Sequence, residues 1–472
     1  MSLMDVARGA YARSPDFVRR ALAPAMTLVP THLKYGATYR RWRDKIAKAS
    51  SDPTYADREH LAALRRVLQQ AHDGSPFYRD LLDKHLGHSF DYAGAMPEDL
   101  RHLPVLRKGE LRKAGDAQLT VPVGSLEKGY TAGSNGEPPF GFYLERGRSS
   151  REMAFVNYAW GRTGLTEDDA KIVLRGFGLE PNGRRITEWE PALRELRLSV
   201  FPMTRKDIAL YLDLIDKYEV QYLYGYPSAI DLLCRHMCVM GRIPRLPIKG
   251  ILPISEPMFE HQRKTIKATL GNVPISNFYG MSEKVLFATE DMEAPHHYRF
   301  NPLYGLAELV DDDGQTITEP GVEGRIIGTG LLTAAQPFIR YDTEDRAELV
   351  ELPSAENGRQ LVLSRIVPRR KPDYLVAANG NRIVTIDFTP ENPKFYTGIE
   401  EYQFYQDTPG KAVIRYIPDA NGTVEDAQRV ADDLARRTLG EMQFTVEEAK
   451  QLATGRAGKR AFIDQRLDVS IY

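Results

Sequence analysis

The sequence is poor in cysteine and has no long apolar run. Cys234 and Cys238 are the only cysteines among its 472 residues, which excludes a disulfide framework and a cysteine-rich zinc module and points to a reducing compartment. It contains no run of about 18 consecutive apolar residues, the length that a membrane-spanning helix requires. We therefore expect a cytoplasmic protein without a spanning segment.

The chain also has almost no net charge. Its 63 Lys and Arg residues nearly balance 64 Asp and Glu residues, and the formal net charge is −1. No global electrostatic attraction to nucleic acid or acidic lipid follows, so neither is an expected partner. With 42% hydrophobic and 27% charged residues, the chain has the composition of a globular protein with more than one domain.

Short apolar runs alternate with helical patterns in the middle of the chain. This order is typical of an α/β fold, in which a mostly parallel sheet is covered by helices on both faces and ligand-binding loops follow the carboxyl ends of the strands. The expected strands are 171–175, 220–224, 248–254 and 274–278, and the expected helices are 207–218, 228–240 and 256–270.

The pattern predicts three regions. Residues 1–58 form a helical N-terminal extension of unassigned role, and 59–369 form a large domain that begins with an amphipathic helix over 59–72. After about Gly305 this domain becomes β-rich, and two prolines around 368–372 indicate a hinge to a small α+β domain over 370–472. The remaining expected strands are 306–310, 324–328, 347–351, 402–405 and 412–417, with a helix over 424–439.

A polar, glycine-containing loop over 130–138 is a candidate phosphate-binding loop. Gly133 and Gly136 permit close backbone approach, and the hydroxyls of Thr131 and Ser134 can donate to anionic oxygens. A plain hairpin turn is the alternative. Neither a Walker A sequence nor a GxGxxG sequence occurs, so the chain lacks the signatures of P-loop and of Rossmann nucleotide-binding proteins.

Three further segments follow this loop in order: 277–283 (Asn-Phe-Tyr-Gly-Met-Ser-Glu), 339–345 (Ile-Arg-Tyr-Asp-Thr-Glu-Asp) and 370–376 (Arg-Lys-Pro-Asp-Tyr-Leu-Val). A fourth, 454–459, reads Thr-Gly-Arg-Ala-Gly-Lys. Together they resemble the adenylate-forming superfamily of acyl-CoA synthetases, in particular its phenylacetate-CoA ligase-like branch, which includes relatives assigned to capsular polysaccharide biosynthesis. The resemblance runs from about Glu59 to the C-terminus.

This resemblance implies a large N-terminal domain and a small mobile C-terminal domain, with ATP and a carboxylic acid reacting between them. The first product would be an acyl adenylate, with release of pyrophosphate, and the acyl group would then pass to CoA or to another thiol or amine. ATP, Mg²⁺ and, for a thioester-forming enzyme, CoA are the implied cofactors. The oligomeric state is left open, with a homodimer as one candidate.

The resemblance also assigns residues. Thr131, Gly133, Ser134 and Gly136 match the phosphate loop, Tyr279 matches the aromatic residue that packs on adenine, and Ser282 belongs to the same ATP-binding motif. Glu283 matches the Mg²⁺-linked glutamate, Asp345 the ribose-binding aspartate and Arg370 the arginine that reaches ribose and phosphate. Lys459 matches the lysine that enters the cleft for adenylation.

These residue types suit the reaction, because a carboxylate that attacks the α-phosphorus needs charge neutralisation rather than a general base. Each also has a structural alternative. Lys459 could be a solvated cation, Glu283 part of a cap for a following helix, Asp345 part of a solvated acidic turn and Arg370 a surface residue.

An aromatic acid is among the candidate substrates, and Tyr226 and Phe278 are candidate residues of its pocket, with plain core packing as the alternative. On a regular helix His236 points about 200° away from both Cys234 and Cys238, so these three side chains cannot share a metal. His296 and His297 are left unassigned.

Two departures from the superfamily pattern leave other functions open. Glu344 stands where relatives usually have glycine, and Pro372 stands where they have an acidic residue. These two residues motivate an alternative interpretation, in which the chain is a degenerate, non-catalytic nucleotide-binding or scaffold protein. A nucleotidyl transferase that leaves AMP on its acceptor is the other alternative.

Overall fold

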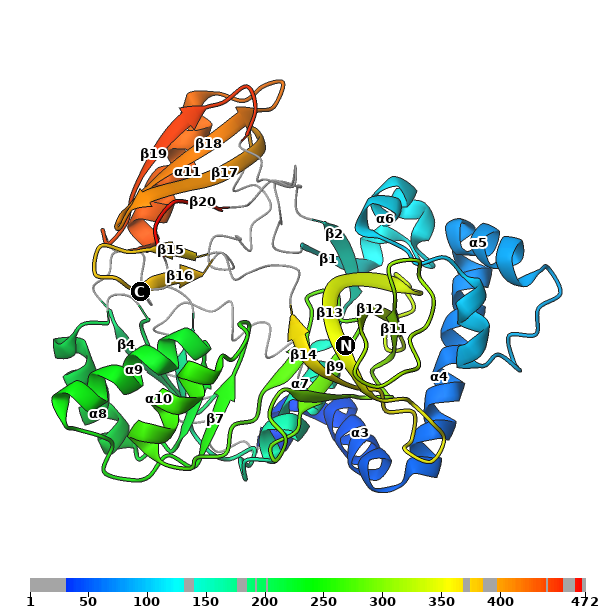
Figure 1. Ribbon diagram of the computed structural model, residues 1–472, viewed down its shortest axis with the longest axis horizontal. Coiled ribbons are helices and arrows are strands. Elements are labelled where there is room, and N and C mark those ends of the chain that lie inside the picture. The colour runs from blue at the N-terminus through cyan, green and yellow to red at the C-terminus, as the bar shows by residue number, and fades with distance from the viewer. Residues whose placement is uncertain are drawn as a thin grey trace.

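The structure is a computed structural model, and the N-terminal and C-terminal parts of the chain form visibly separate units in it (Figure 1). The residues that it describes are 31–130, 140–175, 185–191, 193–200, 203–367, 374–384, 397–438, 440–452 and 463–468. No helix in these ranges has the length and apolar character needed to span a bilayer.

Helices dominate the first part of the chain. The Asp52 side chain accepts from the backbone N–H of Tyr55 and Ser75 accepts from that of Tyr78, so polar caps start two consecutive helices, each of which also begins with proline. The helix predicted over 59–72 lies inside the first of these and is confirmed. The helices are α3 (Thr31–Ser51), α4 (Pro53–Gly74), α5 (Pro76–Leu86), α6 (Lys108–Ala114) and α7 (Ser149–Gly161).

The predicted mostly parallel sheet is confirmed. Its five strands lie in the order β4-β5-β3-β6-β7, and all neighbouring pairs are parallel except β4 with β5. The strands are β3 (Lys171–Leu174), β4 (Thr187–Glu190), β5 (Glu195–Leu198), β6 (Tyr222–Gly225) and β7 (Gly250–Pro253).

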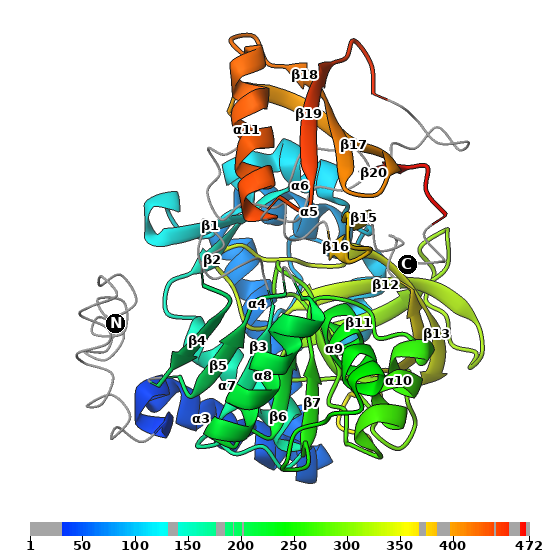
Figure 2. The same cartoon turned by 90° about the vertical axis from the view of Figure 1, so that its left-hand side faces the viewer.

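Helices cover both faces of this sheet, which explains why its central strands are continuous apolar runs. On one face Val173 and Tyr224 pack with Trp160 of α7. On the other face Ile172 and Leu223 pack with residues of the three helices that connect or follow the strands (Figure 2). Those helices are α8 (Arg205–Tyr218), α9 (Pro227–Met240) and α10 (Glu260–Leu270).

Two predicted boundaries in this region are wrong. The helix expected over 256–270 begins at Glu260, since the side chain of Glu256 is engaged elsewhere and Pro257 follows it. The strand expected over 274–278 is reduced to a single parallel bridge between Ile251 and Ile275. From that bridge the chain crosses from the parallel sheet into a second sheet, which it joins only at Phe278.

The second sheet has seven antiparallel strands in the order β11-β12-β13-β14-β10-β9-β8. Helices α4 and α5 and the hairpin β1–β2 pack on it through Leu64, Leu68, Tyr78 and Phe142. The strands of the sheet and hairpin are β1 (Leu126–Tyr130), β2 (Gly141–Glu145), β8 (Phe278–Gly280), β9 (Phe287–Glu290), β10 (His297–Phe300), β11 (Gly305–Val310), β12 (Glu323–Gly330), β13 (Tyr341–Glu351) and β14 (Val362–Val367).

The C-terminal unit has its own four-stranded sheet, in the order β19-β18-β17-β20, and one helix that packs on it. It lies to one side of the two larger sheets (Figures 1 and 2), and its buried residues, such as Leu375 and Phe404, belong to the same apolar cluster as those of the parallel sheet. Its elements are β15 (Tyr374–Val376), β16 (Arg382–Val384), β17 (Ile399–Thr408), β18 (Lys411–Pro418), α11 (Val424–Arg437), β19 (Gln443–Glu448) and β20 (Ile463–Gln465). The α+β character predicted for this region is confirmed.

Candidate functional site

A cavity of about 470 Å³ lies where the parallel sheet meets the seven-stranded sheet. The loop after β7 forms one wall, as expected for a ligand site at the carboxyl ends of parallel strands. The other walls come from α7, from β8 and the turn after it, and from the middle of β13. Segments from residue 108 to residue 366 therefore line one space.

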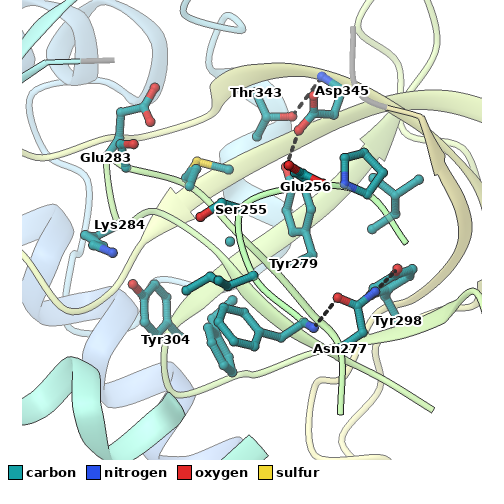
Figure 3. Close-up of a pocket in the computed structure, with 18 of the residues that line it drawn as sticks. Ser255, Glu256, Asn277, Tyr279, Glu283, Lys284, Tyr298, Tyr304, Thr343 and Asp345 are labelled. Atoms are coloured by element: carbon teal, nitrogen blue, oxygen red, sulfur yellow. Dashed lines mark hydrogen bonds between the residues drawn. The ribbon is translucent and has the colours of Figure 1, made fainter. Parts of the chain in front are cut away.

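Tyr279 and Asp345 meet in this cavity. The Tyr279 hydroxyl donates to Oδ2 of Asp345 at 2.6 Å, and the Asp345 backbone N–H donates to Oγ1 of Thr343 at 3.2 Å (Figure 3). Burial raises the pKa of Tyr279 well above its ordinary value, and the negative charge of Asp345 raises it further, so the hydroxyl stays protonated and acts as a donor. Asp345 lies in strand β13, which does not agree with the alternative of a solvated acidic turn.

Glu283 is 5% exposed and lies in the turn between β8 and β9. The hydroxyl of Tyr341 donates to its Oε1 at 2.8 Å, and burial raises the pKa of that tyrosine far above its ordinary value. A strand follows this turn, so the alternative that Ser282 and Glu283 cap a helix is wrong. Glu283 is a carboxylate held by a buried donor at the cavity wall.

Glu344 has a left-handed backbone, with φ of 68°. L-residues with a side chain rarely adopt this conformation, whereas glycine does so at little cost, which gives a physical reason for the glycine that relatives usually have here. The Glu344 N–H donates to Oδ1 of Asp342 at 2.8 Å, and its carboxylate pairs with Lys108 Nζ at 2.9 Å. Lys108 also lines the cavity and neutralises this added charge.

Backbone strain recurs around the cavity. Ser255 has φ of 68° and Lys284 has φ of 62°, and both line the same space as Glu344. Left-handed backbone at non-glycine residues is costly and concentrates at functional sites. Its occurrence on three separate wall segments is independent support for a site here.

A buried polar network that the sequence did not reveal supports another part of the wall. The side-chain amide of Asn277 donates to the Tyr298 hydroxyl at 2.9 Å, and both residues line the cavity (Figure 3). Burial and the charge of Glu290 raise the pKa of Tyr298. Glu290 in turn accepts two hydrogen bonds from Arg263, at 2.6 and 2.7 Å. Asn277 stands in the 277–283 motif, whereas Tyr298 had no sequence signal.

A second polar group that the sequence did not reveal comes from α7. Glu152 lines the cavity, accepts from the Tyr304 hydroxyl at 2.7 Å and has Lys284 Nζ at 3.7 Å. Burial, and after it the charge of Glu152, raises the pKa of Tyr304 well above its ordinary value. A single glutamate inside an otherwise unremarkable helical pattern gave no indication of this position.

The structure thus brings four predicted site residues into one cavity: Phe278, Tyr279, Ser282 and Glu283. Asp345 joins them from a different strand. Tyr226 does not: it is 6% exposed and packs in the core beside α9, so its place in a substrate pocket stays a prediction. The other predicted residues lie outside the described ranges; these are Thr131, Gly133, Ser134, Gly136, Arg370 and Lys459.

No cluster of three or more histidine, cysteine or acidic side chains capable of holding a metal occurs within the described ranges. On α9, Cys234 is buried and Cys238 is exposed. A magnesium ion bound through substrate phosphates needs only one or two protein carboxylates, and Glu283 is a residue of that kind.

No protein-family model matches the chain. Two curated proteins are similar to most of it. Protein CapK of Staphylococcus aureus is 23% identical over 397 residues, which cover 82% of this chain and 84% of CapK. Phenylacetate-coenzyme A ligase of Escherichia coli (strain K12) is 24% identical over 323 residues, which cover 65% of this chain and 70% of the ligase.

The fold is also found among solved structures. A crystal structure of 2-hydroxyisobutyryl-CoA ligase, in complex with 2-HIB-AMP and CoA in the thioesterification state, has a TM-score of 0.53 with this chain. It is 18% identical, and the match covers 88% of this chain and 90% of that one. The similarity therefore extends over both the large and the small domain.

Proposed function

We propose that this chain, which is similar to CapK and to phenylacetate-coenzyme A ligase, is a member of the adenylate-forming superfamily: an ATP-dependent ligase that activates a small carboxylic acid as an acyl adenylate and releases pyrophosphate. The acyl group would then pass to CoA or to another thiol or amine. The observation that carries this proposal is the single cavity in which Tyr279 donates to Asp345 at 2.6 Å while Glu283 lines the same space.

Each described residue would have one task in the first step. Asp345, an acceptor on a β-strand, would take hydrogen bonds from the ribose hydroxyls, and the ring of Tyr279 would pack on adenine. Glu283 would hold a magnesium ion that neutralises the phosphate oxygens. The cavity walls would hold the acid and the α-phosphorus together, and such positioning provides much of the catalysis in phosphoryl transfer.

The remaining assignments extend this proposal to residues outside the described ranges. Thr131, Gly133, Ser134 and Gly136 would surround the phosphates, and Arg370 would reach the ribose. Lys459 would arrive with a mobile C-terminal domain and stabilise the negative charge of the transition state. A cytoplasmic location is part of the proposal, and two free thiols agree with it.

Lys108 weakens the main argument for a degenerate scaffold. That alternative depends partly on the negative charge of Glu344 next to the ribose site, and a 2.9 Å ion pair neutralises this charge. Transfer of AMP to an acceptor would use the same nucleotide site, and the mass of the product distinguishes it from acyl transfer.

The test is ATP–pyrophosphate exchange against a panel of aromatic, aliphatic and amino acids. We expect acid-dependent exchange by the wild type and a loss on the order of 10²–10³ in rate for Lys459→Ala, the size seen when one preorganised donor is removed. Lys450→Ala, a change at an exposed lysine of the same domain, is the matched control and should retain activity. Circular dichroism checks that both variants fold.

Two results would contradict the proposal. One is the absence of exchange with every acid of the panel. The other is exchange by Lys459→Ala at the wild-type rate, which would mean that this lysine does not act in adenylation.

A further inference from the structure

The cavity has two ends, and the nucleotide of the proposed function would occupy only one of them. In Figure 3, Thr343 and Asp345 lie on one side, Tyr304 and Lys284 lie on the opposite side, and Tyr279 is between them. On the proposed function, on which this inference rests, Tyr279 and Asp345 hold the nucleoside. The acid must then lie on the other side of Tyr279, with its carboxylate facing the phosphates beside Glu283 and its far end toward Lys284 and Tyr304.

The walls at this acid end combine rings with charge. Val156, Phe278 and Phe287 contribute apolar surface. Between them stand Glu152 and Lys284, whose side chains are 15% and 36% exposed. A carboxylate among rings is expensive to desolvate, so a ligand that covers it with a methyl or phenyl group alone would lose binding energy.

Among the described residues, Glu152 has contacts at only one of its two carboxylate oxygens. Both of its recorded partners, the Tyr304 hydroxyl at 2.7 Å and Lys284 Nζ at 3.7 Å, approach the same oxygen, Oε2. An ionised carboxylate has two oxygens and room for about four hydrogen bonds. Within the described part of the chain, Oε1 therefore has capacity for a donor from a ligand.

Tyr304 keeps this carboxylate in place. Its ring is 2% exposed and packs edge-on against Phe155, at 4.9 Å between ring centroids, so the hydroxyl is aimed by a buried aromatic cluster rather than by a mobile side chain. Sites that are built to hydrogen-bond a substrate group reject analogues without that group strongly, because the buried partner is left unpaired.

We propose that the acid activated by this protein carries a hydrogen-bond donor, a hydroxyl or an amino group, at the end away from its carboxylate, and that Glu152 accepts from this donor. Glu152 is thus a specificity-determining residue. The apolar walls contact the carbon skeleton between the two polar ends. The pocket is expected to disfavour purely apolar acids such as an unsubstituted phenylacetate.

The experiment compares matched acids in ATP–pyrophosphate exchange. The pairs are phenylacetate with its para-hydroxy and para-amino derivatives, and butanoate with its gamma-hydroxy and gamma-amino derivatives. We expect the wild type to prefer at least one substituted acid over its apolar parent by about ten- to hundredfold in kcat/KM, the range for hydrogen bonds to charged groups.

Variants at Glu152 connect this preference to the residue. Glu152→Met has a similar length without an acceptor carboxylate and should abolish the preference, while Glu152→Gln keeps one neutral acceptor and should give an intermediate preference. The second variant is isosteric, so it keeps the test valid if the methionine variant does not fold. Glu293→Gln, at an exposed position, is the control and should leave the preference unchanged.

The outcomes separate the inference from the proposed function. Exchange that is equally fast or faster with every apolar parent would overturn the role of Glu152 and leave the ligase activity standing, as would an unchanged preference in both Glu152 variants. Absence of exchange with all acids would overturn the ligase activity and this inference together.

Discussion

Glu344 shows how one residue can depart from a superfamily pattern without removing the site. Its left-handed backbone costs roughly 1–2 kcal/mol relative to an ordinary conformation. Its carboxylate also adds negative charge to a cavity that would hold a triphosphate. The ion pair with Lys108, in which both side chains are less than one-fifth exposed, offsets this charge.

Removing Lys108 should therefore affect nucleotide binding. In Lys108→Met the positive charge beside the Glu344 carboxylate is removed, which makes the cavity more negative, so we expect KM for ATP to rise severalfold, corresponding to about 1 kcal/mol, with a smaller change in kcat. Exchange kinetics at varied ATP concentration provide the measurement.

The double variant Lys108→Met, Glu344→Gly is the control for this prediction. It removes both charges and relieves the backbone strain, so KM for ATP should return toward the wild-type value. A KM that stays high in the double variant would mean that Lys108 contacts the nucleotide directly.

His60 predicts how stability depends on pH. It is 2% exposed, its Nδ1 lies 2.8 Å from the carbonyl oxygen of Pro302, and burial lowers its pKa to about 4. The folded protein binds this proton less tightly than the unfolded chain, whose histidine pKa is about 6.5. The stabilisation is therefore fully present above about pH 6.5 and is lost as the pH falls toward 4.

From pH 7 to pH 4.5, the free energy of unfolding should fall by about 2–3 kcal/mol through this residue alone. Urea denaturation at the two pH values measures the fall, and His60→Gln should show a fall that is smaller by this amount. Equal pH dependence in both proteins would show that His60 is not responsible.

At the scale of elements, Glu256 links helix α9 to the cavity. Helix α9 has no side-chain cap from Tyr226, the residue before it. Glu256, from the loop after β7, supplies the missing acceptor: its Oε2 accepts from the Ser228 N–H at 3.1 Å and its Oε1 from the Ser228 hydroxyl at 2.9 Å. The negative charge of Glu256 also interacts favourably with the dipole at the N-terminus of α9.

Glu256→Ala should consequently lower the free energy of unfolding by about 1–2 kcal/mol, the size of a lost N-cap. It should also raise KM for ATP, because residues 254–257 line the cavity and lose their anchor. Glu260→Ala, at an exposed position in the first turn of α10, is the matched control, and an equal effect in both variants would contradict the anchoring role.

For the whole molecule, the separate sheets predict separable unfolding. The four-stranded C-terminal sheet shares no strand with the sheets of the large domain. We expect two transitions in differential scanning calorimetry. With ATP and Mg²⁺ at about 100 times the dissociation constant, the large domain should gain about 2.7 kcal/mol, so its transition should move up most. One transition that shifts as a unit would contradict this independence.

Prediction from the sequence succeeded for segments whose apolar pattern is compatible with only one type of secondary structure. Strands β3, β6 and β7 are apolar because helices bury both of their faces, and the helices between them are amphipathic, so periodicity identified them. It failed for 274–278, because that segment leaves one sheet for another, and no local pattern reports such a crossing.

Within the site, Tyr279, Glu283 and Asp345 could be recognised because they stand in motifs whose order along the chain is characteristic of a superfamily. Lys108, Glu152 and Tyr304 could not. Their importance depends on which side chains lie opposite them, and those partners are between 132 and 236 residues away in the chain. Lys108 meets Glu344, and Glu152 meets Lys284 and Tyr304.

The amino-acid sequence by itself determined the α/β architecture, the balance of charge and the motif residues, since these follow from local periodicity, composition and the order of short segments. Only the tertiary structure decided that the Tyr279 hydroxyl donates to Asp345, that Lys108 pairs with Glu344 and that Glu152 lines the same cavity. The physical reason is that hydrogen bonds and ion pairs act over a few ångströms in space. Such proximity arises between distant segments only when two sheets and their helices pack together.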